Sequence, residues 1–65
     1  MRIEVNGDAR EITGATVAAA LEELGWREAR VATALNGAFV PKAARADTRL
    51  TAGDRLEVLA PMQGG

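Results

Sequence analysis

The sequence has no histidine, cysteine, serine or tyrosine among its 65 residues, and these absences exclude much side-chain chemistry. Histidine is the usual acid or base near neutral pH, and serine and cysteine are the common activated nucleophiles. Neither a serine or cysteine triad nor a zinc site of cysteine and histidine can be built from this chain. A chain this short can lack several residue types by chance, so the absences exclude activities without naming one.

Charge of one sign, aromatic residues and long apolar runs are scarce too. Eight basic and nine acidic residues are interspersed, the net charge is −1, and Trp26 and Phe39 are the two aromatics. Nucleic-acid binding normally requires a basic face and stacking aromatics, so we expect no nucleic-acid partner. No apolar run approaches the length of a membrane helix, and the chain starts on a strand-like pattern rather than a secretory signal. We therefore expect a cytoplasmic protein with no membrane partner.

The first residues predict a β-hairpin. Residues 1–6 alternate between apolar and polar side chains, which is typical of a strand. Asn6-Gly7 then signals a tight turn, because tight hairpin turns need positive φ. A second short strand is expected over about residues 9–13, with Ile12 on its buried side.

One main helix is expected after the hairpin. Thr16 is its predicted N-cap, since a threonine hydroxyl accepts a hydrogen bond from an otherwise unpaired helical N–H. The apolar residues at helical spacing are Val17, Ala20, Leu21 and Leu24. Glu22 and Glu23 diverge by about 100° on a helix, so they predict a solvated face rather than an acid–base pair. Gly25 is expected to end the helix in a left-handed conformation.

The second half of the chain predicts three more strands. The expected elements are a strand over residues 30–36, a short strand over 38–40, an irregular stretch over 42–48 with room for one helical turn, and a last strand over 55–60. Asn36-Gly37 marks a second hairpin turn. In the last strand Leu56, Val58 and Ala60 are expected to point inward. Because one helix covers only one face of such a sheet, we predict an α+β fold with an exposed second face.

The end of the chain has a composition suited to reach rather than packing. We expect one domain over residues 1–60, followed by a flexible tail over 61–65. Gly64 and Gly65 carry no Cβ, so together with Gln63 they can thread a narrow cleft and bring a carboxylate to a nucleotide or metal. Glycine is destabilising inside regular structure, which fits its place here. A frayed terminus explains the two glycines equally well on this evidence alone.

Any chemistry at such a carboxylate would need a partner. A carboxylate is a poor electrophile, and joining it to AMP makes a mixed anhydride that a sulfur or amine nucleophile attacks. The chain has no P-loop or other glycine-rich phosphate cradle, so a partner would supply ATP binding, metal and catalysis. We expect no metal site in the chain itself, because turn chemistry accounts for Asp8 and Asp54.

A series of short motifs runs through the whole chain. They are Asn6-Gly7, Thr16-Val17 at the start of a helix rich in Leu and Glu, Ala34-Leu35-Asn36-Gly37, Phe39-Val40-Pro41-Lys42, Leu50, Gly53-Asp54, Leu56-Glu57-Val58 and Gly64-Gly65. In this order and spacing they resemble the ThiS family, the sulfur-carrier proteins of thiamin biosynthesis. The resemblance implies a ubiquitin-like β-grasp: a mixed sheet of about four to five strands with one main helix on one face.

The resemblance also implies a protein cosubstrate rather than an enzyme. Gly65 would be adenylated by an E1-like, ThiF-type enzyme that uses ATP, and then converted to a thiocarboxylate with sulfur from a cysteine desulfurase relay or equivalent donor. A ThiG-type thiazole synthase would take that sulfur, and the chain would bind no cofactor of its own. Two alternatives stay open: a related carrier for molybdopterin or tRNA thiolation, and a non-covalent β-grasp interaction module.

A docking patch is expected near the base of the tail. Leu59 is out of phase with the inward residues of the last strand, which places it on the open face. Together with Met62 and Phe39 it would form the patch, because partner surfaces favour methionine and aromatic residues. A single exposed leucine is also ordinary, so simple partial burial is the alternative.

Overall fold

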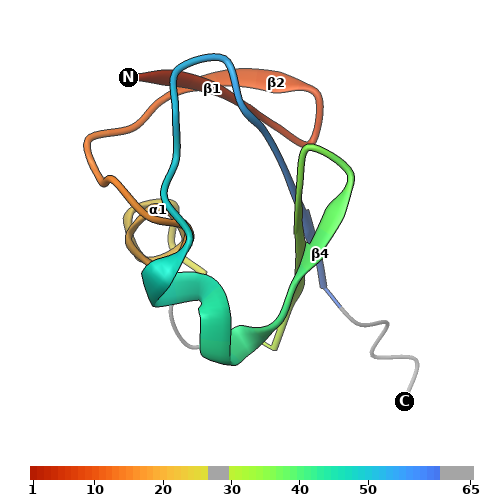
Figure 1. Ribbon diagram of the computed structural model, residues 1–65. Coiled ribbons are helices and arrows are strands. Elements are labelled where there is room, and N and C mark those ends of the chain that lie inside the picture. The colour runs from red at the N-terminus through yellow and green to blue at the C-terminus, as the bar shows by residue number, and fades with distance from the viewer. Residues whose placement is uncertain (27–29, 61–65) are drawn as a thin grey trace.

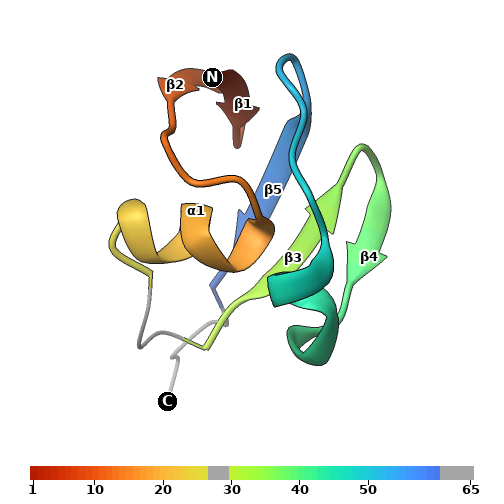
Figure 2. The ribbon, with the colours of Figure 1, turned by 60° about the vertical axis from the view of Figure 1, so that its left-hand side comes forward.

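Five strands and one α-helix form the fold in the computed structural model, which describes residues 1–26 and 30–60 (Figure 1). The elements are β1 (Arg2–Val5), β2 (Asp8–Glu11), α1 (Val17–Glu23), β3 (Ala32–Leu35), β4 (Ala38–Val40), the 3₁₀-helix η1 (Lys42–Asp47) and β5 (Arg55–Leu59). The strand order is β2-β1-β5-β3-β4, with β1 and β5 parallel and the other neighbours antiparallel. The mixed sheet with one main helix on one face agrees with the prediction (Figure 2).

Both hairpin turns form where the Asn-Gly pairs predict them. Asn6 and Asn36 adopt φ of 51° and 52°, and Gly7 and Gly37 follow with φ of 89° and 86°. Asparagine tolerates this left-handed region better than most residues, and the type of turn that needs it matches the twist of the flanking strands. The turns therefore set the register of β1 with β2 and of β3 with β4.

The signals at both ends of α1 are confirmed. The hydroxyl of Thr16 accepts a hydrogen bond from the N–H of Ala19 at 3.1 Å. At the other end Gly25 has a φ of 92°, and the N–H of Trp26 donates to the carbonyl of Leu21 at 2.8 Å. This is a Schellman ending, in which the residue after the left-handed glycine closes the last turn.

The apolar core lies between α1 and one face of the sheet. Its buried members are Ile3, Val5, Ile12, Val17, Ala20, Leu21, Leu50, Leu56 and Val58. Leu24 and Trp26 are partly buried and pack against this cluster. Alternate residues of β1 and β5 supply the sheet side, as the two-residue period of a strand requires.

The expected strand ends are less accurate than the strands themselves. The second and third strands are Asp8–Glu11 and Ala32–Leu35, rather than residues 9–13 and 30–36. The prediction that Ala60 points inward is wrong, because Ala60 lies beyond β5 and is exposed. The ladder with β3 stops at the pair Ala32–Leu59, so no neighbouring strand holds residue 60 against the core.

The segment after β4 is a 3₁₀-helix that is tied to β3 by Arg45. The guanidinium of Arg45 donates to the Thr33 hydroxyl at 3.2 Å and to the carbonyl of Val31. The same hydroxyl donates to the carbonyl of Val40 at 2.8 Å, so the buried Thr33 side chain is satisfied. Among the described helices, none is long and apolar enough to span a membrane.

Candidate functional site

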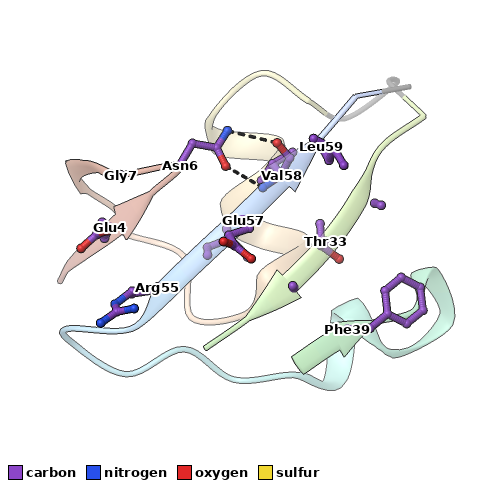
Figure 3. Close-up of a pocket in the computed structure, with 12 residues that line it drawn as sticks. Glu4, Asn6, Gly7, Thr33, Phe39, Arg55, Glu57, Val58 and Leu59 are labelled. Atoms are coloured by element: carbon purple, nitrogen blue, oxygen red, sulfur yellow. Dashed lines mark hydrogen bonds between the residues drawn. The ribbon is translucent and has the colours of Figure 1, made fainter. Parts of the chain in front are cut away.

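The face of the sheet away from α1 is hollowed into a groove of about 600 Å³, which we call the open-face groove (Figure 3). It is lined by Glu4, Asn6, Gly7, Ala32, Thr33, Ala34, Phe39, Arg55, Leu56, Glu57, Val58 and Leu59. These residues come from β1 and its turn, β5, β3 and β4, so the groove crosses four adjacent strands. The single helix leaves this face uncovered, as expected for the fold.

One side of the open-face groove is apolar. Leu59 is 72% exposed and Phe39 is 70% exposed, which is unusual for side chains of this size. In the sheet Leu59 pairs with Ala32 across β5 and β3, and Phe39 pairs with Ala34 across β4 and β3. The two large side chains therefore stand on either side of β3, whose small alanines form the floor between them.

The other side of the open-face groove is charged. In the strand ladders Glu4 on β1 lies opposite Arg55 on β5, and Glu57 on β5 lies opposite Ala34 on β3. An apolar strip with a charged margin is the usual composition of a surface that binds another protein. In residues 1–26 and 30–60 no three acidic side chains gather into a group that could hold a metal ion.

A side-chain clasp joins the first turn to β5 within the same groove. The carboxamide nitrogen of Asn6 donates to the carbonyl of Val58 at 3.0 Å, and the N–H of Val58 donates to the carboxamide oxygen at 2.8 Å (Figure 3). Sequence reasoning missed this contact. The two residues are 52 positions apart, and Asn6 is already explained locally as a turn residue.

Of the three predicted docking residues, the structure describes Leu59 and Phe39. Leu59 and Phe39 lie on the same open face, two strands apart, or about 10 Å across the sheet. Leu59 is the last residue of β5, so it lies where the chain leaves the sheet. Met62 and the tail residues Gln63, Gly64 and Gly65 lie outside the described residues.

Glu23 is exposed as expected, but its carboxylate has a structural role. It accepts hydrogen bonds from the N–H groups of Thr13 and Gly14 at 3.0 Å each, and from the Thr13 hydroxyl at 3.1 Å. The two backbone donors, Thr13 first, hold the pKa of Glu23 below its ordinary value of 4.5. The side chain thus fixes the loop that leads into α1.

Known proteins of similar sequence and structure agree with this fold. The model of the ThiS family matches residues 3–65. A thiazole synthase of Paramagnetospirillum magneticum is 38% identical over 66 residues, which cover all of this chain and 20% of that protein. The crystal structure of a thiamine biosynthesis protein (ThiS) from Geobacter metallireducens superposes with a TM-score of 0.82 at 33% identity, over the full length of both chains. The predicted β-grasp fold is confirmed, and the chain spans about a fifth of the curated relative.

Proposed function

The chain belongs to the ThiS family, and from this premise we propose that it is a sulfur carrier of thiamin biosynthesis whose reacting group is the carboxylate of Gly65. The observation that carries the proposal is the family match, which runs through residue 65 and includes the Gly64-Gly65 pair. The composition supports a carrier rather than a catalyst, since no serine, cysteine or histidine is available for nucleophilic or acid–base work.

The proposed chemistry starts by converting the carboxylate into an electrophile. A carboxylate oxygen of Gly65 attacks the α-phosphorus of ATP, which forms the acyl-adenylate and releases pyrophosphate. A persulfide from a cysteine desulfurase relay then attacks the carbonyl carbon, and AMP leaves with the electron pair of the broken C–O bond. A thiolate cleaves the resulting acyl disulfide at its S–S bond. The products are the thiocarboxylate of Gly65 and a disulfide on the donor side.

Two enzymes would act on this carboxylate in turn. A ThiF-type activating enzyme would bind ATP and form the adenylate, and a ThiG-type thiazole synthase would consume the thiocarboxylate. The Paramagnetospirillum magneticum protein supports the second partner. It is named thiazole synthase, and one fifth of it resembles this whole chain, so the carrier-like segment and that named activity share one polypeptide. This favours thiazole formation over molybdopterin or tRNA thiolation.

We propose that both partners dock on the open-face groove. Leu59 and Phe39 supply the exposed apolar contacts, and Leu59 also ends the strand from which the tail departs. From Leu59 to Gly65 the backbone reaches at most about 20 Å. A partner seated on the groove would therefore receive the carboxylate in an active site within that distance.

Intact-mass analysis tests the proposal directly. The chain is incubated with a ThiF-type enzyme, ATP, a persulfide donor and a thiol that can cleave the acyl disulfide. With the enzyme and ATP but no persulfide donor, we expect the mass of the acyl-adenylate. With the full mixture we expect a product in which sulfur replaces one oxygen. A synthetic chain with a carboxamide at Gly65 is the matched control, because it differs from the native chain only at the terminal group and has no carboxylate to attack ATP. A chain that keeps its original mass in the full mixture contradicts the proposal.

The pathway is tested with the purified thiocarboxylate. We expect a ThiG-type thiazole synthase to regenerate the carboxylate form while sulfur enters the thiazole ring. A molybdopterin synthase and a tRNA thiolation enzyme are offered the same thiocarboxylate in parallel. Transfer to either of these, with none to the thiazole synthase, would assign the carrier to the alternative pathway.

A further inference from the structure

The end of β5 extends beyond the strand that pairs with it on one side. The parallel ladder between β1 and β5 contains the pairs Glu4–Arg55 and Val5–Leu56. The N–H of Asn6 still donates to the carbonyl of Leu56 at 3.0 Å. The chain then turns away toward β2, and β1 ends before it reaches Val58. The backbone of Val58 therefore needs another partner on that side, because it is buried.

The side chain of Asn6 provides that partner. A carboxamide presents one donor and one acceptor much as a peptide group does, and Asn6 uses them on the carbonyl and the N–H of Val58 at 3.0 and 2.8 Å (Figure 3). On its other side β5 pairs with β3 through Thr33–Val58 and Ala32–Leu59. The clasp thus adds one more hydrogen-bonded pair, Asn6–Val58, to the side of β5 that faces β1. Val58 is the next-to-last residue of β5.

We propose that Asn6 is a positioning residue for the carboxylate of Gly65, an inference that rests on the proposed function of that group. Without the clasp, the backbone of Val58 would have no hydrogen-bond partner on the β1 side. The end of β5 would then be held only by its ladder with β3 and by the buried Val58 side chain, so it would move more freely. From Val58 to Gly65 the backbone reaches at most about 25 Å, and the end of β5 sets the point from which that reach starts. A strand end that shifts would therefore move the whole region in which the carboxylate can lie. Docking through the open-face groove would persist, but fewer docked chains would present the carboxylate correctly.

Asn36 offers a matched control at the opposite end of the same strand. It has nearly the same φ, 52° against 51° for Asn6, in the same kind of Asn-Gly turn. Its carboxamide accepts from the N–H of Arg55 at 2.9 Å and donates to the carboxylate of Asp54 at 3.1 Å. Asn36 therefore clasps the start of β5, whereas Asn6 clasps the end that leads to the tail.

The test compares Asn6→Gly with Asn36→Gly. Glycine adopts positive φ freely, so each change removes a carboxamide without straining its turn. Amide hydrogen exchange measures how well the clasp protects the backbone of β5. Steady-state kinetics of a ThiF-type enzyme measure how often a docked chain presents its carboxylate for adenylation. Both are measured well below the unfolding temperature of each variant, with circular dichroism as the check on folding.

For Asn6→Gly we expect exchange at the N–H of Val58, which donates to Asn6, to accelerate about three- to tenfold, as for the loss of a typical hydrogen bond. We expect kcat for adenylation to fall by a similar factor while KM stays within about twofold. Asn36→Gly should leave both quantities close to native. Asn6→Asp keeps the acceptor for the N–H of Val58 but loses the donor, so its kcat should lie between native and Asn6→Gly.

Three results would overturn the inference. These are unchanged exchange at Val58 in Asn6→Gly, an equal fall in kcat for the two glycine variants, or a change in KM with kcat intact. They are distinct from failure of the proposed function, in which the native chain itself is not adenylated. In that case the exchange comparison still decides whether Asn6 holds the end of β5.

Discussion

The carboxylate of Glu23 accepts hydrogen bonds from two backbone N–H groups in the loop before α1, those of Thr13 and Gly14. Because these bonds favour the charged form, the pKa of Glu23 in the folded chain lies below 4.5. A lowered carboxyl pKa stabilises the folded state above the unfolded pKa, and this contribution is lost as pH falls through the folded pKa. The charge of this one residue therefore links the stability of the loop to pH.

We expect Glu23→Gln to be less stable than the native chain near neutral pH and to approach it in acid. Urea unfolding of both chains between about pH 7 and about pH 3 measures the difference. Thr13→Val is the control, because it removes the hydroxyl but keeps both backbone donors, so most of the pH dependence should remain. A stability difference between native and Glu23→Gln that stays constant over this range would contradict the role assigned to the charge.

Gly14 allows the same loop to lie directly against α1. A Cβ added at Gly14 would lie 2.6 Å from the Cβ of Ala19 and 3.2 Å from its carbonyl carbon. Neither atom is the end of a flexible side chain, so the loop or the helix would have to move. We expect Gly14→Ala to cost about 1–3 kcal/mol of unfolding free energy, as overpacking usually does, and denaturant unfolding measures this.

A double-mutant cycle separates this clash from other effects at Gly14. Ala19→Gly removes the closer of the two contacts, at the cost of about 1 kcal/mol for a glycine within a helix. If the clash explains the loss, the double variant should be more stable than the sum of the two single losses predicts. Strictly additive losses would show that Gly14→Ala acts through something other than Ala19.

At the scale of the element, β5 has one buried and one exposed face, and the docking proposal assigns partner binding to the exposed one. Leu56 is fully buried in the core, whereas Leu59, three residues later, is 72% exposed. We expect Leu56→Ala to cost about 2–5 kcal/mol of unfolding free energy, and Leu59→Ala to stay within about 0.5 kcal/mol of native. The same substitution, leucine to alanine, should thus lower the unfolding free energy strongly at Leu56 and hardly at Leu59, and denaturant unfolding measures both losses.

The docking proposal predicts the reverse order for partner binding. Leu59→Ala should raise the KM of a ThiF-type enzyme about fivefold or more, as the loss of a central apolar contact does. Enzyme kinetics on the folded variant measure this. Ala43→Gly serves as the control for an exposed change elsewhere, because Ala43 lies on η1 and does not line the open-face groove. Equal KM values for native and Leu59→Ala would remove Leu59 from the docking patch.

The elements that sequence predicted well are those with a local cause. The Asn6 and Asn36 turns, the Thr16 cap and the Gly25 ending each depend on residues within one turn of the chain. Alternation along β5 was likewise enough to place Leu59 on the open face. These features need no knowledge of which strands become neighbours.

Contacts that depend on the order of strands in the sheet could not be predicted from the sequence. β1 and β5 come from opposite ends of the chain, so the clasp of Asn6 on Val58 follows only once they are adjacent. Arg45 on η1 likewise donates to Thr33 on β3, 12 positions away, which no local pattern predicts. Phe39 and Leu59 share one groove for the same reason, since β3 lies between their strands.

For the molecule as a whole, the two faces of the sheet differ in burial. The face against α1 contains the buried cluster, whose members among residues 1–26 and 30–60 lie between Ile3 and Val58. The opposite face bears the open-face groove and leads along β5 toward the tail. Removing the last residue should therefore change neither the core nor the groove, so the function proposed for the carboxylate can be tested separately from both.

Deletion of Gly65 tests this separation and the non-covalent alternative together. We expect an unchanged unfolding temperature, because Val58 is the last member of the buried cluster in the part of the chain that the structure describes. The new carboxylate, on Gly64, would lie about 3.5 Å short of its place in the activating enzyme, and misplacement of about 1 Å already costs about a hundredfold in rate. The rate of adenylation should thus fall at least a hundredfold.

The shortened chain should still compete with the native one for the enzyme, at an inhibition constant near the native KM, because its groove is intact. A non-covalent module predicts full partner function after the deletion, and that outcome would replace the carrier function with the module.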